Sequence, residues 1–564
     1  MTKILIIGGV AGGATALARL RRLDEKAEII LFERGPHVSY ANCGLPYFIG
    51  NVIEKQDKLL LASKESFMRQ YNAEARLRNE VTAIDAQNKT VTVKNLETGA
   101  TYTESYDKLL LSPGAAPLRP PIKGIDLEGV YTLRTVEDAV RIKTAVQTGC
   151  VKRAVIVGGG FVGMEVAENL AETGVKPIIV EMQPQIMANF DTDMAQELEN
   201  SIRKMAIPLF LGQSVQEISR EVDGRMKVVT SLNKSILCDM VFLGLGVKPE
   251  TSLVKAAGLK LNERGAIIVN PCMQTSDPDI YAVGDAVEIR DFVTKAPTQI
   301  PLAGPANLQA RIAADNMLGH SSQYQGSQGT FILKLFQCVA AATGLTEKAC
   351  QRAGIACQVS YTHSQSNAGY YPGAEMLTIK LIFAPDTGKI LGAQIHGRKG
   401  VDKRIDVLAT AIRANMTVFD LINLELAYAP PFGSAKEPIN IAGMVAANII
   451  SGAMPVIHWH QLNDIDWDNT VIIDVREPDE LEHVGRIKTG TNIPLGKLRQ
   501  AIANGEIDKN KTIIITCAVG RRGYLATSIL LQNGYRAYNL SGGFTTFKTM
   551  KCLILRDAKH PEKW

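Results

Sequence analysis

The sequence predicts an α/β protein of several domains, with two βαβ nucleotide-binding units and a smaller α/β domain at its C-terminal end. The chain has 564 residues, and at roughly 100–200 residues per domain this length corresponds to about three to five domains. A strand, a glycine-rich turn and a helix follow one another twice, within residues 3–33 and 153–181. A fresh pattern of strands and helices begins near residue 464.

The composition is that of an ordinary globular protein. Hydrophobic residues make up 46% of the chain and charged residues 21%, which argues against disorder. Lys and Arg (62) exceed Asp and Glu (57) by five. So small a surplus on a long chain argues against a general nucleic-acid binder, but it permits a local basic patch for a phosphorylated ligand.

The cysteines and the N-terminus bear on the compartment. None of the nine cysteines forms a C-x-x-C pair, so we expect neither a zinc ribbon nor a thioredoxin-type pair, and we predict no metal site. Cysteines this sparse favour a reducing cytoplasm. The run ILIIGGVAGGATALA resembles a signal peptide, but its four glycines would break a signal helix. No apolar run reaches the roughly 18 residues of a membrane span. We therefore expect a cytoplasmic protein without membrane or nucleic-acid partners.

The first βαβ unit has a strand over 3–7, a helix over 14–23 and a strand over 28–32 that is followed by Glu33. Its turn, GGVAGG, departs from the G-x-G-x-x-G pattern because Val10 stands where the second glycine is expected. Glu33 nevertheless has the position of the acid that binds a ribose. The unit is therefore Rossmann-like, either with a bound dinucleotide or as a glycine-rich turn without a ligand.

A distant second signature favours a flavin at this unit. The segment YAVGDA places Asp285 beside a glycine just after a strand end, where a carboxylate can hold the ribityl hydroxyls of a flavin. We therefore predict an FAD site. The predicted FAD-binding residues are Gly8, Gly9, Gly12, Gly13, Glu33, Arg34, Ser112, Gly114, Arg134, Gly284 and Asp285.

The second unit fits the full pattern, with a strand over 153–157, GGGFVG over 158–163 and a helix over 164–173. The glycines permit a tight turn and the close approach of a pyrophosphate to the helix N-terminus. Glu181 ends the next strand, where its charge would repel a 2′-phosphate and thus favours NADH over NADPH. The predicted NADH-binding residues are Gly158, Gly160, Gly163, Glu181 and Gly246.

The strands between and after these units predict that the second nucleotide-binding domain is inserted into the first. Strand-like segments over 107–117, 239–249 and 275–287 each run into a turn that contains glycine. The predicted boundaries are 1–118 and 250–325 for the FAD domain, 119–249 for the NADH domain, 326–450 for an α+β domain, 451–463 for a linker and 464–564 for the C-terminal α/β domain.

Residues 1–450 resemble the two-dinucleotide flavoprotein disulfide reductases. Within that group, the segment SYANCGLPY at 39–47 resembles the coenzyme A disulfide reductases, which have one redox cysteine instead of a C-x-x-x-x-C pair. The cysteine that follows Cys43 along the chain is Cys150. The resemblance implies that Cys43 attacks a sulfur–sulfur bond. Such a thiol needs a low pKa, which a helix N-terminus after Cys43 and partner donors would supply; the alternative is a buried structural cysteine.

Residues 456–564 resemble a rhodanese (sulfurtransferase) module. The matching residues are Asp474, Val475, Arg476 and Glu477, Gly485, the segment Asn492-Ile493-Pro494, and Cys517-Ala518-Val519-Gly520-Arg521-Arg522. Arg486 stands where many rhodaneses have histidine. The fusion of both parts resembles the coenzyme A disulfide reductase–rhodanese proteins, which are NADH-dependent persulfide reductases.

The resemblance also implies two tyrosines from the opposing subunit that assist the thiol, and hence a homodimer that uses 326–450 as its dimerisation domain. The best matches are Tyr428 and Tyr370, although Tyr371 competes with Tyr370. A phenol can protonate a departing thiolate. The alternative is a pair of core or interface tyrosines.

Coenzyme A would bring three phosphates to the first domain. Arg19 and Arg22 are three residues apart on one face of the first predicted helix and are candidates for those phosphates. Ser39 and Asn42 are candidates for the thiol end. The alternative for the two arginines is a solvated basic face.

In the C-terminal domain, Cys517 begins a loop between a strand and a helix. Backbone N–H groups of 518–522, with Arg522, would hold a sulfur anion, unless the domain is an inactive docking module. The predicted activity is NADH-driven, FAD-dependent reduction of a coenzyme A persulfide, polysulfide or disulfide at Cys43. Two alternatives remain, an NADH oxidase or peroxidase that uses a sulfenic acid at Cys43 and a redox-sensing sulfur carrier with little turnover.

Overall fold

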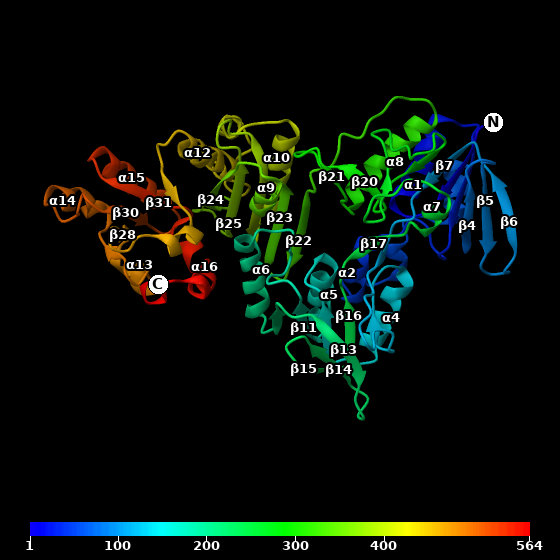
Figure 1. Cartoon of the computed structure of the whole chain (residues 1–564), viewed down its shortest axis with the longest axis horizontal. Coiled ribbons are helices and arrows are strands. Elements are labelled where there is room, and N and C mark those ends of the chain that lie inside the picture. Colours follow the sequence, from blue (N-terminus) through cyan, green and yellow to red (C-terminus); the bar gives the residue numbers. More distant parts are fainter. The chain divides into compact units, whose positions relative to one another are not determined.

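The computed structural model describes all 564 residues, 1–564, which form two compact units (Figure 1). The first unit comprises residues 1–187 and 205–329, and the second comprises residues 188–204 and 330–564. None of the helices combines the length and the apolar character needed to cross a membrane.

The first sheet of the first unit is parallel and has the order β19-β7-β1-β2-β3. Its central strand β1 is buried on both faces, since Ile4, Leu5 and Ile6 are fully inaccessible, as expected for a parallel strand covered by helices. Helices α1 and α8 pack against each other beside this sheet. The bounds are β1 (Lys3–Ile7), β2 (Glu28–Glu33), β3 (Glu74–Leu77), β7 (Lys108–Leu111), β19 (Ile280–Ala282), α1 (Ala11–Leu23) and α8 (Ala303–Met317).

The second sheet of this unit repeats the arrangement, with the parallel order β12-β11-β10-β16-β9. In both sheets the glycine turn follows the central strand, β1 or β10, at the point where the strand order reverses and where such folds bind their ligands. The bounds are β9 (Val130–Tyr131), β10 (Arg153–Val157), β11 (Lys176–Glu181), β12 (Leu209–Leu211), β16 (Met240–Leu243), α4 (Val136–Gln147) and α5 (Phe161–Glu172).

Both glycine-turn helices begin earlier than the sequence predicts, at Ala11 and Phe161 instead of residues 14 and 164. The first turn of α1 therefore contains Gly12 and Gly13, and the first turn of α5 contains Gly163, whereas the other glycines of the two turns precede the helices. The smaller elements of this unit are α2 (Leu45–Ile49), α3 (Lys64–Tyr71), α7 (Ser252–Ala256), β4 (Asn79–Asp85), β5 (Thr90–Asn95), β6 (Thr101–Ser105), β8 (Ala115–Pro117), β13 (Val215–Arg220), β14 (Met226–Thr230), β15 (Ser235–Cys238), β17 (Val247–Pro249), β18 (Ile267–Ile268), β20 (Val287–Arg290) and β21 (Pro297–Thr298).

The second unit begins with an antiparallel sheet of order β22-β23-β26-β25-β24, so that β24 lies at an edge. Helix α10 packs on β23 and β26, and α12 packs on β24 and β25. The bounds are β22 (Phe331–Leu335), β23 (Cys338–Gly344), β24 (Gln358–Gln365), β25 (Met376–Phe383), β26 (Ile390–Gly397), α6 (Thr192–Lys204), α9 (Glu347–Ala353), α10 (Val401–Arg413), α11 (Val418–Ile422) and α12 (Pro438–Ile450).

A buried ionic cluster ties α6 to this sheet. The Nζ of Lys380 lies 2.9 Å from an oxygen of Asp193, 2.7 Å from Glu347 and 3.1 Å from Asp191. The side chain of Lys380 is 1% exposed, and the hydroxyl of Tyr361 donates to Asp193. The cluster explains why residues 188–204, predicted to lie within the NADH domain, belong to the second unit.

The C-terminal sheet is parallel, with the order β27-β31-β30-β28-β29 (orange to red in Figure 1). Residues Ile473, Ile513 and Ile515 point into one core with α14 and α15, whereas Ile472 and Ile514 point into another with α16. The bounds are β27 (Val456–Ile457), β28 (Thr470–Asp474), β29 (Thr491–Asn492), β30 (Thr512–Thr516), β31 (Arg536–Leu540), α13 (Pro478–Val484), α14 (Leu498–Ala503), α15 (Arg521–Gln532) and α16 (Gly543–Asp557).

The segment predicted as a linker, 451–463, is partly built into this domain. Strand β27 lies within it and pairs with β31. The indole N–H of Trp459 instead donates to Asp193 of α6, outside this domain, over 3.5 Å. Only two residues of β27 are paired, which is too short a run to produce a strand pattern in the sequence.

Candidate active sites

The first glycine turn is packed so tightly that side chains are excluded. Gly8 has a φ of +95°, and a Cβ there would lie 2.1 Å from the carbonyl oxygen of Ser112. A Cβ at Gly13 would lie 1.8 Å from the carbonyl oxygen of Gly8. The carboxylate of Glu33 accepts the N–H of Gly9 at 2.9 Å. It retains lone pairs for further donors such as ribose hydroxyls.

The second turn repeats this geometry. The carboxylate of Glu181 accepts the N–H of Gly159 at 2.5 Å, and a Cβ at Gly158 would lie 2.3 Å from the carbonyl oxygen of Gly244. At Gly160, by contrast, a Cβ would meet nothing within 4 Å. Packing does not require this glycine, and the open space at the N-terminus of α5 fits a pyrophosphate. In the first unit the N-cap of the helix is Val10.

The other predicted flavin residues lie in the same unit. Asp285 accepts no hydrogen bond from the protein, and burial raises the pKa of its carboxyl while the charge of Arg134 opposes that rise. The Arg134 guanidinium covers Gly114, where a Cβ would lie 2.2 Å from its Nη2. A half-buried carboxylate without a protein donor fits the hydroxyl-binding role proposed for Asp285. The guanidinium of Arg34 is held by Glu250 at 2.7 Å.

Cys43 lies in a single turn of 3-10 helix, Asn42–Gly44, just before the short helix α2. The preceding loop is tied to the first glycine turn, because the N–H of Ser39 donates to the carbonyl of Gly9 at 2.7 Å. Ser39 itself has a left-handed backbone, with a φ of +46°. This loop brings the exposed Cys43 next to the predicted flavin site.

The groups around Cys43 within the chain raise the pKa of its thiol. Desolvation raises the pKa of the thiol, and the carboxylates of Glu165 and Asp285 raise it further. The predicted helix N-terminus is too short to offset them, since α2 has five residues.

Burial also raises the pKa of Glu165 to about 7, and the Tyr47 hydroxyl donates to this carboxylate at 3.5 Å. No motif in the sequence indicated Glu165, whereas Tyr47 ends the segment SYANCGLPY but had no role assigned to it.

The two arginines proposed for coenzyme A phosphates differ in their surroundings. The Nε of Arg19 forms an ion pair with Asp315 at 2.6 Å. Arg22 is exposed, and its guanidinium lies 5.7 Å from the centroid of the Tyr71 ring. The guanidinium of Arg22 therefore has no carboxylate partner and is free to bind a phosphate. A phosphate at Arg19 would have to share the guanidinium with the carboxylate of Asp315.

In the second unit, Tyr370 and Tyr428 lie together. Their hydroxyls are 3.1 Å apart, and their side chains are 78% and 47% exposed. This hydrogen bond raises the pKa of Tyr428. The competing Tyr371 instead donates its backbone N–H to Ala368. Exposed aromatic side chains that contact each other are available to a second molecule.

Cys517 lies at the end of β30 and is 1% exposed. Its Sγ accepts the backbone N–H groups of Gly520 and Gly523, each at 3.2 Å. The left-handed backbone of Gly520, with a φ of +90°, turns the first of these toward the sulfur. The loop is thus a set of N–H donors at the N-terminus of α15, which stabilises a thiolate or persulfide anion. One donor, Gly523, lies just beyond the predicted range 518–522.

Arg522 is held beside this loop by a carboxylate that the sequence did not single out. Glu480 forms a bidentate ion pair with it at 2.6 and 2.7 Å. Glu480 also caps α13, as the third residue after Glu477 in a capping box. The sequence does not mark Glu480, because the N-cap is Glu477 and the capping-box signature has Ser, Thr, Asp or Asn at that position. Its contact with Arg522 spans 42 residues and is not visible in the sequence.

Comparison with known proteins agrees with this geometry. Residues 2–306 match the pyridine nucleotide-disulphide oxidoreductases, residues 331–438 match the dimerisation domain of the same group, and residues 459–550 match the rhodanese-like domain. A coenzyme A disulfide reductase from Staphylococcus epidermidis is 37% identical over 447 residues, which cover 79% of this chain and 100% of that relative.

Two solved structures are similar over nearly the whole chain. The reduced Bacillus anthracis protein designated CoADR-RHD has 46% identity and a TM-score of 0.95, with 100% of this chain and 99% of that chain covered. A NAD-dependent persulfide reductase from A. fulgidus has 34% identity and a TM-score of 0.90, with 97% and 100% covered.

Proposed function

Because the chain belongs to the pyridine nucleotide-disulphide oxidoreductase family, we propose that it uses NADH and FAD to reduce a sulfur–sulfur bond of coenzyme A persulfide, polysulfide or coenzyme A disulfide at Cys43. The observation that carries the proposal is a single exposed cysteine on a loop anchored to the first glycine turn. A lone thiol has no resolving cysteine and must take its second sulfur from the substrate.

The residues described above would hold both dinucleotides. Glu33, Asp285 and the turn at 8–13 fit FAD, and Glu181 with Gly160 fits NADH. Bound FAD supplies a two-electron carrier between the nicotinamide and the sulfur. The acid at Glu181 disfavours a 2′-phosphate, which supports NADH over NADPH.

Chemistry at Cys43 balances as a thiol–disulfide exchange followed by a reduction. The Cys43 thiolate attacks one sulfur of the substrate, forms a mixed disulfide and releases hydrosulfide or a thiolate. Two electrons that originate from NADH then cleave the mixed disulfide and return the Cys43 thiolate and the second thiolate. Asn42 directly precedes Cys43 and Ser39 lies four residues before it, and both are proposed to bind the thiol end of coenzyme A. Arg19 and Arg22 are proposed to bind the coenzyme A phosphates.

The tyrosine pair is the reason that the proposed enzyme needs two subunits. We infer that Tyr428 and Tyr370 of one subunit reach Cys43 of the other, where a phenol donates a hydrogen bond to the departing thiolate and protonates it. The raised pKa of Tyr428 keeps this phenol protonated at neutral and mildly alkaline pH.

The C-terminal domain is proposed to carry sulfane sulfur as a persulfide on Cys517 and to deliver it to coenzyme A or to Cys43. Two N–H donors and the nearby Arg522 stabilise the sulfur anion that this requires. This function is tested by measuring sulfide released from coenzyme A persulfide and thiol released from coenzyme A disulfide per NADH consumed. NADH consumption with oxygen or peroxide as the only acceptor that supports turnover would favour the NADH oxidase or peroxidase alternative.

The proposed transfer of sulfur from Cys517 to coenzyme A or to Cys43, the relay, has its own test. Cys517→Ser should abolish NADH-dependent sulfide release that starts from thiosulfate, a sulfur donor that is not among the substrates proposed for Cys43, because the N–H donors of the loop then hold no thiolate. Turnover of coenzyme A disulfide should remain as in the wild type. Cys552→Ser, an exposed cysteine of the same domain, is the matched control. If the Cys517→Ser variant processes every sulfur donor at the wild-type rate, the relay is wrong.

The carboxylate of Glu165 should set the pH dependence at Cys43. Because this negative charge raises the thiol pKa, Glu165→Gln should lower it and shift the acidic limb of the kcat/KM profile to lower pH. The shift should be largest above about pH 7, where Glu165 is ionised. Glu172→Gln, exposed on the same helix, should leave the profile in place. An unchanged profile in Glu165→Gln would show that this charge does not act on Cys43.

A further inference from the structure

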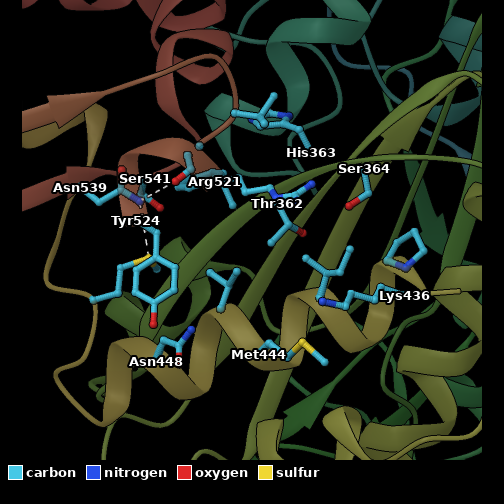
Figure 2. Close-up of a pocket in the computed structure, with 18 of the residues that line it drawn as sticks. Thr362, His363, Ser364, Lys436, Met444, Asn448, Arg521, Tyr524, Asn539 and Ser541 are labelled. Carbon is cyan, nitrogen blue, oxygen red and sulfur yellow. Dashed lines mark hydrogen bonds between the residues drawn. The ribbon is translucent and has the colours of Figure 1, made fainter. Parts of the chain in front are cut away.

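A cavity of about 620 Å³ lies in the second unit, beside the loop of Cys517 (Figure 2). It is bounded by the edge strand β24, by α12, and by the loop segments 519–521 and 541–542. Its volume is within the roughly 300–1,000 Å³ of small-molecule sites. The function proposed above does not use it.

One wall of the cavity is apolar and belongs to α12. Ile441, Met444 and Val445 line it together with Asn448, and the spacing i, i+3, i+4, i+7 places all four on one face of the helix. The opposite face of α12 is buried against the sheet. The wall is therefore a half-exposed apolar surface that faces a space large enough for a ligand.

The charged side chains that line the cavity are positive. Lys436 and Arg521 contribute to the lining, and no Asp or Glu does. Neither cation forms an ion pair with a carboxylate in the structure. The half-buried His363 adds no charge at neutral pH, since desolvation and the neighbouring His396 lower its pKa to about 3. An anion is thus favoured electrostatically over a cation.

Two buried polar atoms in the lining lack partners. Thr362 is 4% exposed and its hydroxyl makes no hydrogen bond, and Asn539 is 3% exposed with an unpartnered Oδ1. Figure 2 shows both residues at the cavity. Buried polar groups without partners are rare in folded proteins, and a bound anion would satisfy the Thr362 hydroxyl. It would not satisfy the Asn539 Oδ1, which only accepts and lies against Gly523, where a Cβ would be 2.2 Å from it. The Thr362 hydroxyl can donate to an anionic oxygen.

The cavity is also connected to the reactive sulfur. Gly520 lines it, and this residue donates its N–H to Cys517 Sγ while its carbonyl accepts from Asn539 at 3.1 Å. We propose that the cavity binds a small organic anion with an apolar body, and that its occupancy is coupled to the reactivity of Cys517 through Gly520. The coupling rests on the role of Cys517 in the proposed function, whereas the binding site does not.

Binding is tested by calorimetry on the full-length, FAD-loaded protein with three probes. Hexane-1-sulfonate should bind, methanesulfonate should bind at least tenfold more weakly because it lacks the apolar body, and hexyltrimethylammonium should not bind because its charge is reversed. Equal affinity for all three probes, or no binding of hexane-1-sulfonate, would overturn the proposal.

Two variants locate the site. Val445→Trp fills the cavity and Lys436→Glu reverses one of its charges, so each should weaken hexane-1-sulfonate binding at least tenfold. Leu525→Trp, on an exposed position of α15 outside the lining, is the matched control and should bind as the wild type does. Because a tryptophan at position 445 can prevent folding, binding to the surface variant Lys436→Glu is measured as the second, independent test of the site. Wild-type affinity in both cavity variants would place the sulfonate elsewhere and refute the site.

The coupling is read from the rate at which iodoacetamide alkylates Cys517, followed by peptide mass spectrometry. Saturating hexane-1-sulfonate should change this rate at least threefold in the wild type and not in Val445→Trp. An unchanged rate at saturation would overturn the coupling. Coenzyme A disulfide turnover at Cys43 should be the same in all variants, which separates failure of this inference from failure of the proposed function.

Discussion

Replacing Cys43 by serine should reduce NADH-driven turnover of coenzyme A persulfide and coenzyme A disulfide by at least about 10³-fold, as expected when a catalytic nucleophile is lost. A serine hydroxyl at this position has neither the nucleophilicity of a thiolate nor the ability to form a disulfide. No neighbouring cysteine can replace it, because the chain has no C-x-x-C or C-x-x-x-x-C pair around residue 43. The measurement is NADH consumption together with released sulfide or thiol.

The same variant should still oxidise NADH with ferricyanide at the wild-type rate, since electron entry requires the two nucleotide sites and not the thiol. Cys150→Ser, another exposed cysteine of the first unit, should behave as the wild type with both acceptors. Persulfide reduction that survives in Cys43→Ser would show that the sulfur–sulfur bond is broken elsewhere. Oxygen consumption lost together with persulfide reduction would show a sulfenic-acid cycle at the same cysteine.

The nucleotide sites could be predicted from the sequence because their signals are local. Glu33 and Glu181 each end a strand that is one helix away from a glycine turn, and each carboxylate accepts an N–H from its own turn. Strand, turn, helix and acid must follow in that order for the contact to form. The pattern in the sequence and the contact in the structure therefore have the same physical origin.

The surroundings of the reactive groups could not be predicted in the same way. Tyr370 and Tyr428 are 58 residues apart, and their contact depends on how two loops of the second unit meet. Likewise, Glu165 acts on Cys43 from α5, a helix whose pattern indicates only a nucleotide fold. Long-range packing decides which carboxylate faces a thiol, and for this reason the sequence did not show that Glu165 raises the pKa of Cys43.

The second large effect is expected on stability, at the buried cluster around Lys380. Lys380→Met should lower the free energy of unfolding of the second unit by about 3–5 kcal/mol, because it leaves three carboxylates without their shared cation. Of these three carboxylates, Asp193 should lose the most stabilisation. Burial raises its pKa, but Lys380, Tyr361 and Trp459 outweigh burial and hold the pKa below its usual value. The measurement is denaturant unfolding of wild type and variant, with FAD bound.

The pH dependence of this loss follows from the sign of the Asp193 shift. A lowered pKa in the folded state means that the stabilisation is fully present above the ordinary carboxyl pKa near 3.8, and that it is lost as the pH falls through the folded value. The difference between wild type and Lys380→Met should therefore be large at neutral pH and shrink in acid. Lys389→Met, exposed after β25, should change stability by less than about 0.5 kcal/mol. Equal stability of wild type and Lys380→Met at pH 7 would contradict the prediction, because it would show that the three carboxylates are not left as uncompensated buried charges when the cation is removed.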